Sequence, residues 1–397
     1  MKNLDEVAMK KIPYGRQTVT EEDIKEVEKV LRSDYLTTGP RLNEFEKTIA
    51  EYHGAKYGVA FSSGTAGLHA AYNSLQIPQG KGILTSPITF VASSNAAIYC
   101  GLKPGFVDID PETNCIDINK IESAITEDTA VITPVAYAGY PVDLGSIHAI
   151  AEKHGCRVIY DAAHAIGSRR NGTFGMEYVD LAVLSFHPVK HVTTGEGGMV
   201  LTNDETLYNR LKLFRSHGIT KDPQLLINND GPWYYEMQSL GFNYRMTDIQ
   251  AALGISQFSR INQNLLSRNK IAKAYNDAFS DLGFLETPPS LGFELLETGD
   301  AGKTENIHAY HLYTLHLCGA QERKAFYEYL HANGILAQIH YIPVHLQPYY
   351  RENFGFRKGD FPAAEKFYDG EISIPMYHNM PDENIEYVIE KIKEYSK

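Results

Sequence analysis

The feature that most constrains the fold of this chain is an alternation of short apolar runs with amphipathic runs between residues 59 and 217. The apolar runs have the length of β-strands, and the runs between them have the apolar spacing of helices. Such an alternation predicts an α/β fold in which a largely parallel sheet is covered by helices on both faces. The predicted strands are Val59–Phe61, Ile83–Thr85, Pro104–Val107, Ala130–Val135, Arg157–Tyr160, Leu181–Ser185 and Met199–Thr202, and the predicted helices are Ala66–Leu75, Asn119–Ile125, Leu144–His154 and Glu205–His217.

The pattern differs on both sides of this region. Before it, Thr20 and Asp23 have the spacing of a capping box and predict a helix with an apolar face, made of Ile24, Val27, Val30 and Leu31. After it, the patterns predict a long helical stretch from Thr247 to about Leu282, strands at His311–Leu317 and Leu336–Tyr341, and helices at Gln321–Ala332 and Asp382–Tyr395.

The chain has 397 residues, which exceeds what one apolar core usually serves. We therefore expect a large α/β domain over residues 34–250 and a smaller α+β domain over residues 251–397. We also expect Gly292–Asn306 to form a surface loop.

The composition argues against several classes of function. The formal net charge of -12 argues against a protein that binds nucleic acid mainly through contacts to its phosphates. No window approaches the roughly 18 apolar residues of a membrane helix, and the first residues lack the apolar stretch of a secretory signal. The four cysteines form no C-x-x-C pair, so we expect reduced thiols and a cytoplasmic protein.

The segment S-S-G-T-A-G lies between a predicted strand and a predicted helix. Gly64 permits a tight turn, and the N–H groups of Thr65 and Ala66 would face outward at the helix start. Such a helix start attracts phosphate through unpaired donors and the helix dipole. An ordinary strand-to-helix turn is the competing interpretation.

Asp161 ends an apolar strand in the segment R-V-I-Y-D-A-A-H-A. A carboxylate at that position is costly unless something neutralises it. It is either the N-cap of a helix or the partner of a protonated pyridine nitrogen. His164 would then lie near the face of that ring, or it has a structural role.

The most informative segment is L-S-F-H-P-V-K-H-V-T-T-G-E-G-G, which contains Lys190. Lysines lie on the surface by default, but this one follows an apolar strand and precedes a glycine-rich exit. One predicted strand separates it from Asp161, so neighbouring strand ends could bring both side chains to one cofactor. A desolvated pocket would lower the pKa of the lysine and leave its amine neutral, ready to attack an aldehyde. Ser185 could add a hydroxyl donor near a phosphate.

Other chemistries have less support. The pairs His308/His311 and His340/His345 have spacings that metal ligands can have. However, 15 histidines make such pairs common and no acidic or cysteine partner lies at fixed spacing, so we expect no metal site. A dinucleotide oxidoreductase or sugar epimerase would need G-x-G-x-x-G after the first strand, and that motif is absent.

Five motifs, in order along the chain, resemble the DegT/DnrJ/EryC1/StrS family of sugar aminotransferases. They are S-x-G-T-A, T-F-V-A-S, Y-D-A-A-H-A, S-F-H-P-V-K-x-x-T-T-G-E-G-G and G-x-N-Y-R-M-T-D-I-Q-A-A-L-G. The resemblance extends from about Tyr14 to Pro375. It implies a fold-type-I enzyme that depends on pyridoxal 5′-phosphate (PLP), with a large, mostly parallel seven-stranded sheet domain and a smaller C-terminal domain. It also implies that residues 1–33 pack toward the smaller domain.

The resemblance also implies substrates and assembly. Y-L-T at Tyr35, F-R-S-H-G at Phe214, G-I-L-A-Q-I-H-Y-I-P-V-H at Gly334 and E-I-S-I-P at Glu371 are most similar to the family members that serve pseudaminic acid synthesis. These members imply L-glutamate as amino donor, 2-oxoglutarate as its product and a UDP-linked 4-keto-6-deoxy-N-acetylhexosamine as acceptor. A homodimer with shared active sites is implied as well.

Roles follow from the resemblance residue by residue. Lys190 matches the Schiff-base lysine, which carries the proton in transamination, and Asp161 matches the partner of the pyridinium nitrogen. Phe90 matches an aromatic residue stacked on the cofactor, and Asn243 matches an asparagine that reaches the phosphate from the other subunit. The other cofactor positions are Ser63, Thr65, Ala66, His164 and Ser185; the nucleotide-sugar positions are Tyr14, Asp34, Tyr35, Leu36, Thr37, Ser63, His340, Tyr341, Ile342 and Pro343.

Two alternatives share this fold. A sugar dehydratase would carry histidine in place of Lys190, and a non-catalytic regulator would bind the cofactor without turnover. His191 departs from the family pattern, in which proline or asparagine follows the lysine, and this difference could alter the pocket.

Overall fold

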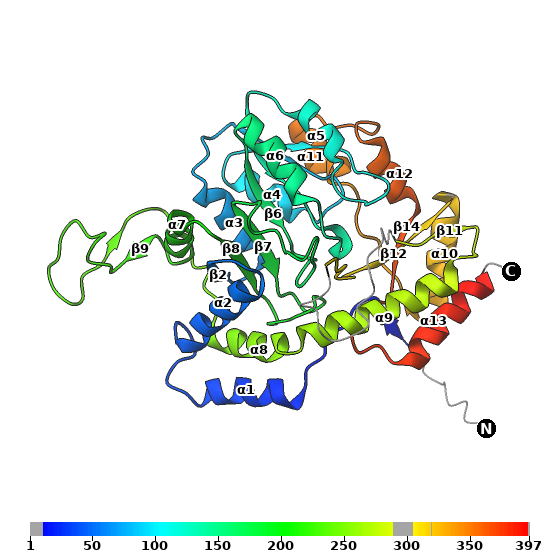
Figure 1. Cartoon of the computed structure of the whole chain (residues 1–397), viewed down its shortest axis with the longest axis horizontal. Helices are drawn as coiled ribbons and strands as arrows, with labels where there is room; N and C mark the ends of the chain where they lie inside the picture. The colour runs from blue at the N-terminus through cyan, green and yellow to red at the C-terminus, as the bar shows by residue number, and fades with distance from the viewer. Residues whose placement is uncertain (1–10, 289–304, 319, 396–397) are drawn as a thin grey trace, which may run out of the picture.

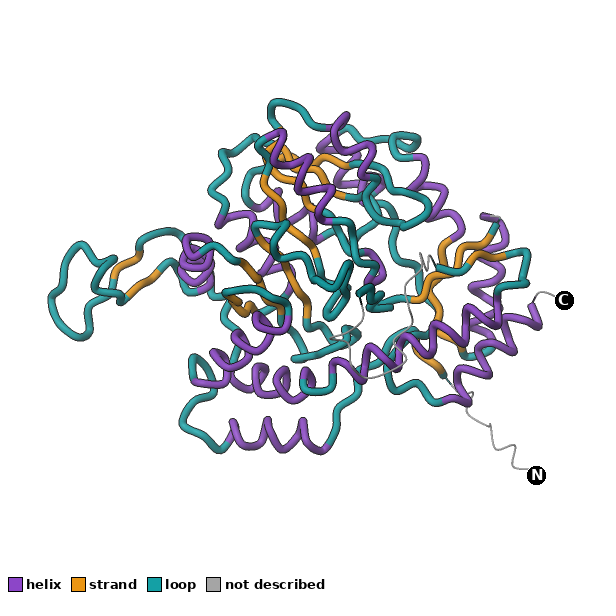
Figure 2. Tube along the Cα trace, in the orientation of Figure 1, coloured by secondary structure: helices purple, strands orange, loops and turns teal. Residues whose placement is uncertain are grey.

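The structure is a computed structural model that describes residues 11–288, 305–318 and 320–395. Its largest sheet has seven strands in the order β2-β8-β7-β6-β5-β3-β4 (Figures 1 and 2). β8 is antiparallel to both of its neighbours, and the other pairs are parallel, so the predicted largely parallel sheet is confirmed. The strands are β2 (Tyr57–Phe61), β3 (Gly82–Thr85), β4 (Lys103–Phe106), β5 (Thr129–Thr133), β6 (Arg157–Asp161), β7 (Leu181–Ser185) and β8 (Gly198–Thr202).

Each face of this sheet has its own apolar core, because successive side chains of a strand point to opposite faces. Val59 and Phe61 belong to the core shared with α3 (Gly64–Ser74), α4 (Ala92–Tyr99) and α7 (Glu205–Arg215). Ala60, between them, belongs to the opposite core. That core is shared with α2 (Pro40–Tyr52), α5 (Ile118–Ala124), α6 (Leu144–His154) and α8 (Asp248–Phe258). Helices therefore cover both faces, as predicted.

A further apolar core joins the C-terminal elements. It includes α9 (Ile261–Phe279), α10 (Ala320–Ala332), α13 (Asp382–Tyr395) and an antiparallel sheet of β11 (Leu285–Glu286), β12 (Tyr313–Leu317) and β14 (Glu371–Ile374). The short β1 (Ile12–Pro13) pairs in parallel with β13 (Ile335–Leu336) at this core. The remaining helices are α1 (Glu21–Leu31), α11 (Pro348–Phe354), α12 (Pro362–Gly370) and the 3-10 turns η1 (Tyr137–Gly139) and η3 (Val344–Leu346).

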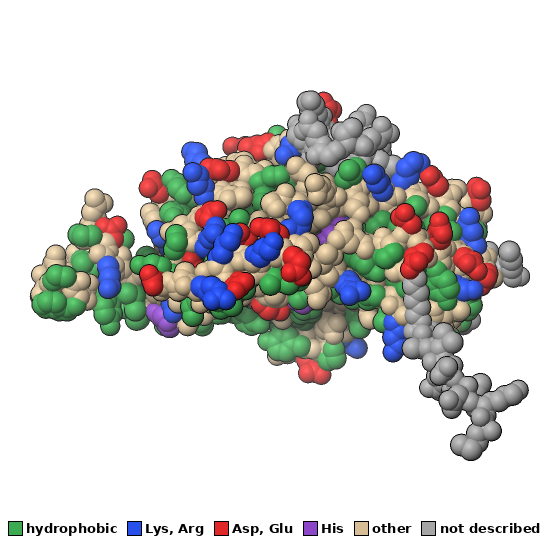
Figure 3. Space-filling model, turned by 90° about the horizontal axis from the view of Figure 1, so that it is seen from below, with side chains coloured by type: hydrophobic (Ala, Val, Ile, Leu, Met, Phe, Trp, Pro, Cys, Tyr) green, Lys and Arg blue, Asp and Glu red, His purple; other side chains and the backbone are tan. Residues whose placement is uncertain are grey.

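Helix α1 has the predicted capping box. The Asp23 carboxylate accepts from Thr20 N at 2.8 Å, and the Thr20 hydroxyl accepts from Asp23 N at 3.4 Å. Val30 is buried, but Ile24 and Leu31 are 51% and 57% exposed, so one chain buries only part of the predicted apolar face. Figure 3 shows oppositely charged side chains interspersed on this side of the molecule.

The helical stretch predicted from Thr247 to about Leu282 is present, and a two-residue break divides it into α8 and α9. At the break, the side chains of Ser256, Gln257 and Arg260 all donate to the buried carboxylate of Asp23, at 2.6–3.0 Å. Hydrogen bonds to a distant segment therefore lie where the expected helix would have continued.

The strand predicted at Leu336–Tyr341 is wrong, because β13 ends at Leu336. His340 N donates to the Glu371 carboxylate at 2.8 Å, and the Tyr137 hydroxyl donates to the His340 carbonyl. Gln338 forms one isolated antiparallel bridge with Ser373 of β14, whereas side chains bond the backbone of His340, so the segment does not continue as a strand.

Residues 217–242 form an arm that projects from the body of the molecule (Figures 1 and 2). β9 (Ile219–Thr220) pairs in antiparallel with β10 (Glu236–Met237), and His217 N donates to the Phe242 carbonyl at 3.0 Å at the base. Hydrophobic side chains gather on the arm (Figure 3); Ile227, Trp233 and Leu240 are 84%, 71% and 74% exposed.

Of the loop expected over Gly292–Asn306, residues 292–304 lie outside the described residues. In the described ranges, no helix has both the length and the apolarity that crossing a membrane requires.

Candidate active site

A cavity of about 460 Å³ lies at the carboxyl ends of β6 and β7, beside the start of α3. Ligands of parallel α/β sheets typically bind outside these strand ends. Sheet, helix and loop residues contribute to its lining: Tyr14, Ser63, Gly64, Thr65, Leu68, Thr89, Phe90, Ala92, Ser93, Val135, Asp161, Ala163, His164, Val183, Ser185, His187, Val189, Lys190, Glu196, His311, His340 and Tyr341.

Asp161 is the last residue of β6 and is 4% exposed. Ser93 Oγ donates to its Oδ2 at 2.6 Å, and Ala163 N donates to its Oδ1 at 3.2 Å. Burial raises the pKa of Asp161, and these hydrogen bonds together with nearby Lys190 oppose the rise. Among the described residues, no cation forms an ion pair with it, so the carboxylate can still receive a cationic N–H group from a ligand.

Lys190 follows β7 in a turn closed by the hydrogen bond from its N–H to the His187 carbonyl at 2.9 Å. Its Nζ lies 3.3 Å from Nε2 of His311. Burial lowers the pKa of Lys190 to about 7; Asp161 opposes this change and Arg268 adds to it. A large fraction of the amine is therefore uncharged near neutral pH, as a nucleophile requires.

The start of α3 provides donors at the same cavity. Ser63 is the N-cap, and its hydroxyl accepts from Ala66 N at 3.1 Å. This bond occupies one of the two N–H groups that we expected to face outward, and Ala66 is not part of the cavity lining. Within the described part of the chain, the N–H of Thr65 has no acceptor, so it remains available to an anion.

The glycine-rich exit after Lys190 brings β8 against this helix start. A Cβ at Gly198 would lie 2.4 Å from the Ser63 carbonyl oxygen and 2.7 Å from Gly64 N. Any side chain there would push the start of α3 away from the end of β7. The close approach explains why the segment requires glycine at this position.

Aromatic and imidazole rings form another side of the cavity. Phe90 is 58% exposed, and its ring centroid lies 6.0 Å from that of Tyr341. The Tyr341 hydroxyl is 3.3 Å from His164 Nε2, and the ring of His164 lies 4.3 Å from that of His311. Burial holds the pKa of His164 and His311 well below the usual value, so both rings are neutral at physiological pH.

The structure brings most of the predicted cofactor residues together. Ser63, Thr65, Phe90, Asp161, His164, Ser185 and Lys190 line the cavity, and so do Tyr14, His340 and Tyr341 from the predicted nucleotide-sugar set. Asp34, Tyr35, Leu36, Thr37, Asn243, Ile342 and Pro343 do not line it. Leu36 and Thr37 instead lie beside the start of α8, and Asn243 is exposed near the base of the arm.

Sequence reasoning missed five polar residues of the cavity, Thr89, Ser93, His187, Glu196 and His311, of which Ser93 and His311 contact Asp161 and Lys190. Ser93 is the last residue of T-F-V-A-S, a motif from which only Phe90 was selected. His311 was considered only as one half of a metal-binding pair with His308. No group of three or more potential metal ligands occurs in the described ranges, and His345 pairs with Glu365 at 3.0 Å.

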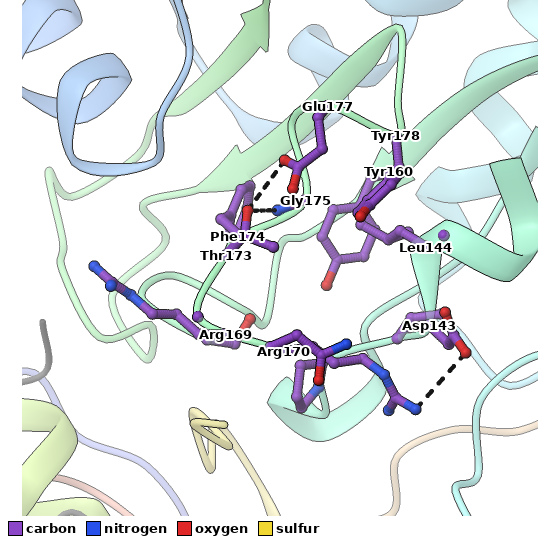
Figure 4. A pocket seen from close by; sticks show the side chains of 16 residues that line it. Asp143, Leu144, Tyr160, Arg169, Arg170, Thr173, Phe174, Gly175, Glu177 and Tyr178 are labelled. Atoms are coloured by element: carbon purple, nitrogen blue, oxygen red, sulfur yellow. Dashed lines mark hydrogen bonds and ion pairs between the residues drawn. The ribbon is translucent and has the colours of Figure 1, made fainter. Parts of the chain in front are cut away.

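A second cavity, of about 320 Å³, lies between residues 141–145 and 168–178 (Figure 4). Its charged groups have partners within the chain. Arg170 lies 3.7 Å from Asp143, and Thr173 Oγ1 donates to Glu177 at 3.0 Å. It therefore lacks a buried carboxylate without an ion-pair partner, which is the feature that distinguishes Asp161.

A model of the DegT/DnrJ/EryC1/StrS aminotransferase family matches residues 17–393. The chain belongs to this family. Among curated proteins, it is 40% identical to Uncharacterized protein MJ1066 of Methanocaldococcus jannaschii, over 96% of this chain and 97% of the relative. It is 34% identical to the UDP-4-amino-4,6-dideoxy-N-acetyl-beta-L-altrosamine transaminase of Campylobacter jejuni, over 96% and 98% of the two chains.

Solved structures of sugar aminotransferases have the same fold. Helicobacter pylori PseC, an aminotransferase involved in the biosynthesis of pseudoaminic acid, has a TM-score of 0.87 at 31% identity, over 97% of this chain and 99% of PseC. The PLP-form of Spr1654 from Streptococcus pneumoniae has a TM-score of 0.86 at 29% identity, over 97% and 98% of the two chains. The fold is thus that of PLP-dependent sugar aminotransferases, and family membership implies an aminotransferase that depends on PLP.

Proposed function

We propose that this chain transfers the amino group of L-glutamate to C4 of a UDP-linked 4-keto-6-deoxy-N-acetylhexosamine, with PLP as cofactor. The product would be UDP-4-amino-4,6-dideoxy-N-acetyl-β-L-altrosamine, a precursor of pseudaminic acid. One observation carries the proposal. A buried carboxylate, Asp161, and an amine of lowered pKa, Lys190, lie in one cavity at the ends of adjacent strands. The 34% identity to the Campylobacter jejuni transaminase supports the choice of substrate.

The residues of the cavity fit PLP group by group. Asp161 would accept the N–H of the pyridine ring, and the N–H of Thr65 with the hydroxyls of Ser63 and Ser185 would hold the phosphate. Phe90 offers an exposed ring to the cofactor face, and His164 lies beside it. When bound, PLP supplies an electron sink that makes the C–H bond next to the amino group acidic.

Lys190 is the proton carrier in this proposal. Its Nζ would take the proton from Cα of glutamate in the first half-reaction; the amino group would stay with the cofactor, and 2-oxoglutarate would leave once water has supplied its keto oxygen. In the second half-reaction it delivers a proton to C4 of the sugar. Because burial keeps its pKa near 7, Nζ can both accept and release a proton at neutral pH.

The nucleotide-sugar would enter past Tyr14, His340 and Tyr341, which line the cavity. The exposed segments Asp34–Thr37 and Ile342–Pro343 are further proposed contacts, although they do not line the cavity in one chain. We propose that a second copy completes the site, with Asn243 reaching the partner's phosphate position. Exposed apolar groups on the arm and on α1 support a homodimer, because monomers rarely expose such groups together.

The proposal keeps the division into an N-terminal segment (1–33), a large PLP-binding domain (34–250) and a small domain (251–397). It also keeps a cytoplasmic setting, in which the cysteines remain reduced; all four are free in the structure.

The test has three steps. Borohydride reduction of the holoprotein, followed by peptide mass spectrometry, should attach the cofactor to Lys190. Adding L-glutamate should convert the bound cofactor to its amine form, seen by absorbance, and Lys190→Ala should lose this conversion at any practical rate. NMR should then identify the amino sugar formed from a panel of UDP-4-keto-6-deoxy sugars.

The outcomes separate the alternatives. Label on another residue would refute the assignment of Lys190. A labelled protein that does not respond to glutamate would be a non-catalytic PLP-binding regulator. A product with the gluco or galacto arrangement would indicate a 4-aminotransferase of bacillosamine- or legionaminic-type pathways.

A further inference from the structure

The amine of Lys190 is hydrogen-bonded to an imidazole rather than to a carboxylate. His311 Nε2 lies 3.3 Å from Nζ. Asp161 lines the same cavity, but no ion pair joins it to Lys190 within the described residues. The choice of partner matters, because an adjacent carboxylate stabilises the ammonium form of a lysine whereas a neutral ring does so far less.

His311 is held in its neutral form by its surroundings. It is 4% exposed, and its ring centroid lies 4.3 Å from that of His164 and 5.8 Å from that of His191. Burial keeps the pKa of His311 well below its usual value, and the positive charge of Arg268, together with that of Lys190 whenever its amine is protonated, adds to this effect. The groups that interact electrostatically with Lys190 are Asp161, His164, His187, His191, Arg268 and His340, of which Asp161 is the only anion in this set.

The hydrogen bonding of His311 favours one tautomer. Its Nδ1 is buried and has no hydrogen-bond partner among the described residues. A proton on Nδ1 would therefore bury an N–H donor with nothing to accept it, which folded proteins avoid more strongly than a bare acceptor. A proton on Nε2 instead points at Lys190 Nζ, which can accept it only through the lone pair of an uncharged amine.

The backbone fixes His311 in this place. Its N–H donates to the Ala138 carbonyl at 2.8 Å, and its carbonyl accepts from Nη1 of Arg268 at 3.2 Å. Gly139, with φ +95°, lies against the same segment, and a Cβ there would come within 3.1 Å of His311 N. Contacts from two separate elements, η1 and α9, thus set the position of His311 relative to Lys190.

We propose that His311 is a positioning residue that donates an Nε2–H hydrogen bond to the uncharged amine of Lys190, orienting Nζ in the cavity and disfavouring its ammonium form. This role rests on the proposed function of Lys190 as nucleophile and proton carrier. Burial lowers the pKa of Lys190, and this hydrogen bond gives the uncharged amine an oriented partner without placing an anion beside it.

The test measures the protonation of Lys190 without the cofactor. The full-length, cofactor-free protein is acylated with limiting acetic anhydride between pH 5 and 10, and peptide mass spectrometry gives the extent of reaction at Lys190. Lys47, whose side chain is 75% exposed, is the internal reference in the same digest. For the wild type, we expect half of the maximal reaction near pH 7.

Three substitutions separate hydrogen bonding from packing. His311→Asn keeps an N–H donor, so the pKa of Lys190 should stay within about 0.5 of the wild type. His311→Phe keeps a ring of similar size without a donor, so the pKa should rise by about 1. His311→Asp introduces a carboxylate, so the pKa should rise by about 2.

The opposite order, in which His311→Phe behaves like the wild type and His311→Asn does not, would mean that His311 only packs, and would overturn the proposal. Circular dichroism melting checks that each variant folds. If His311→Phe does not fold, His311→Leu takes its place, because it also removes the donor; a Lys190 pKa equal to that of the wild type in this variant overturns the proposal. Borohydride labelling tests the proposed function separately, since a wrong order of pKa values leaves the attachment of the cofactor to Lys190 intact.

Discussion

Two buried carboxylates, Asp161 and Glu371, illustrate how this chain separates chemistry from scaffolding. Asp161 is 4% exposed and Glu371 is 0% exposed, and burial raises the pKa of both, that of Glu371 to about 8. Each accepts two hydrogen bonds; those to Glu371 come from the Ser373 hydroxyl at 2.6 Å and from His340 N at 2.8 Å. Asp161, however, lines the cavity and Glu371 does not.

The difference teaches that burial and a raised pKa do not by themselves mark a functional acid. Asp161 has space beside it for a cation supplied by a ligand. Glu371 is enclosed by protein and fixes the backbone of His340, which in turn lines the cavity. We therefore expect substitutions of the two carboxylates to differ in size and in kind.

The largest expected effect is that of Asp161→Asn. The amide keeps the shape and the hydrogen bond from Ser93, but it cannot neutralise a cation, and breaking a buried ion pair costs about 3–5 kcal/mol. Stopped-flow absorbance should show the glutamate half-reaction slowed by about 10²- to 10⁴-fold. Glu371→Gln is the matched control and should slow it by less than about tenfold; equal losses in the two variants would contradict the distinction.

An intermediate effect is expected on the pH dependence of stability. The Glu371 pKa is about 8 in the folded chain against a usual value of 4.5. Between these values the folded state binds a proton that the unfolded state does not, so this group's contribution to stability falls as the pH rises. Glu371→Gln cannot titrate, so its unfolding free energy relative to wild type should rise by about 1 kcal/mol per pH unit between pH 6 and 8.

Denaturant unfolding of both proteins at pH 6, 7 and 8 measures this difference. A constant gap between the two proteins would show that Glu371 does not hold its proton in this range.

The smallest expected effect is that of Tyr341→Phe, which removes the hydroxyl that lies 3.3 Å from His164 Nε2. One neutral hydrogen bond contributes about 0.5–1.5 kcal/mol, so the KM for the sugar should rise by about two- to tenfold with little change in kcat. Steady-state kinetics measures both constants. Tyr349→Phe is the control, because Tyr349 is 53% exposed and does not line the cavity; a loss confined to kcat would argue against a role of Tyr341 in binding.

Local patterns predicted the elements whose hydrogen bonds and apolar faces are local. Leu181–Ser185, Leu144–His154 and Asp382–Tyr395 have the bounds that periodicity indicated. The sequence also predicted that Asp161 and Lys190 lie close together, because Asp161 ends β6 and Lys190 follows β7, which is the parallel neighbour of β6. Strand length, helix periodicity and the alternation of strands and helices are therefore sufficient to predict the bounds of these elements and the proximity of the two side chains.

Contacts between distant segments account for the failures. The backbone of His340, after the end of β13, donates to Glu371, which lies 31 residues further along the chain. Asp248 lies at the start of α8, but its carboxylate caps a different helix. It accepts from Gly39 N at 2.7 Å and from Arg41 N at 3.0 Å, at the start of α2. His311 reaches Lys190 across 121 residues. No periodicity in the sequence encodes such pairs.

The closed base of the arm has a consequence for how this protein can diverge. His217 and Phe242 are hydrogen-bonded to each other, so the chain leaves and rejoins the body at a single point. Segments anchored in this way tolerate insertion and deletion, because their ends do not move when their length changes. The length and sequence of the outer part of the arm can therefore change during evolution without displacing the reactive groups at the strand ends.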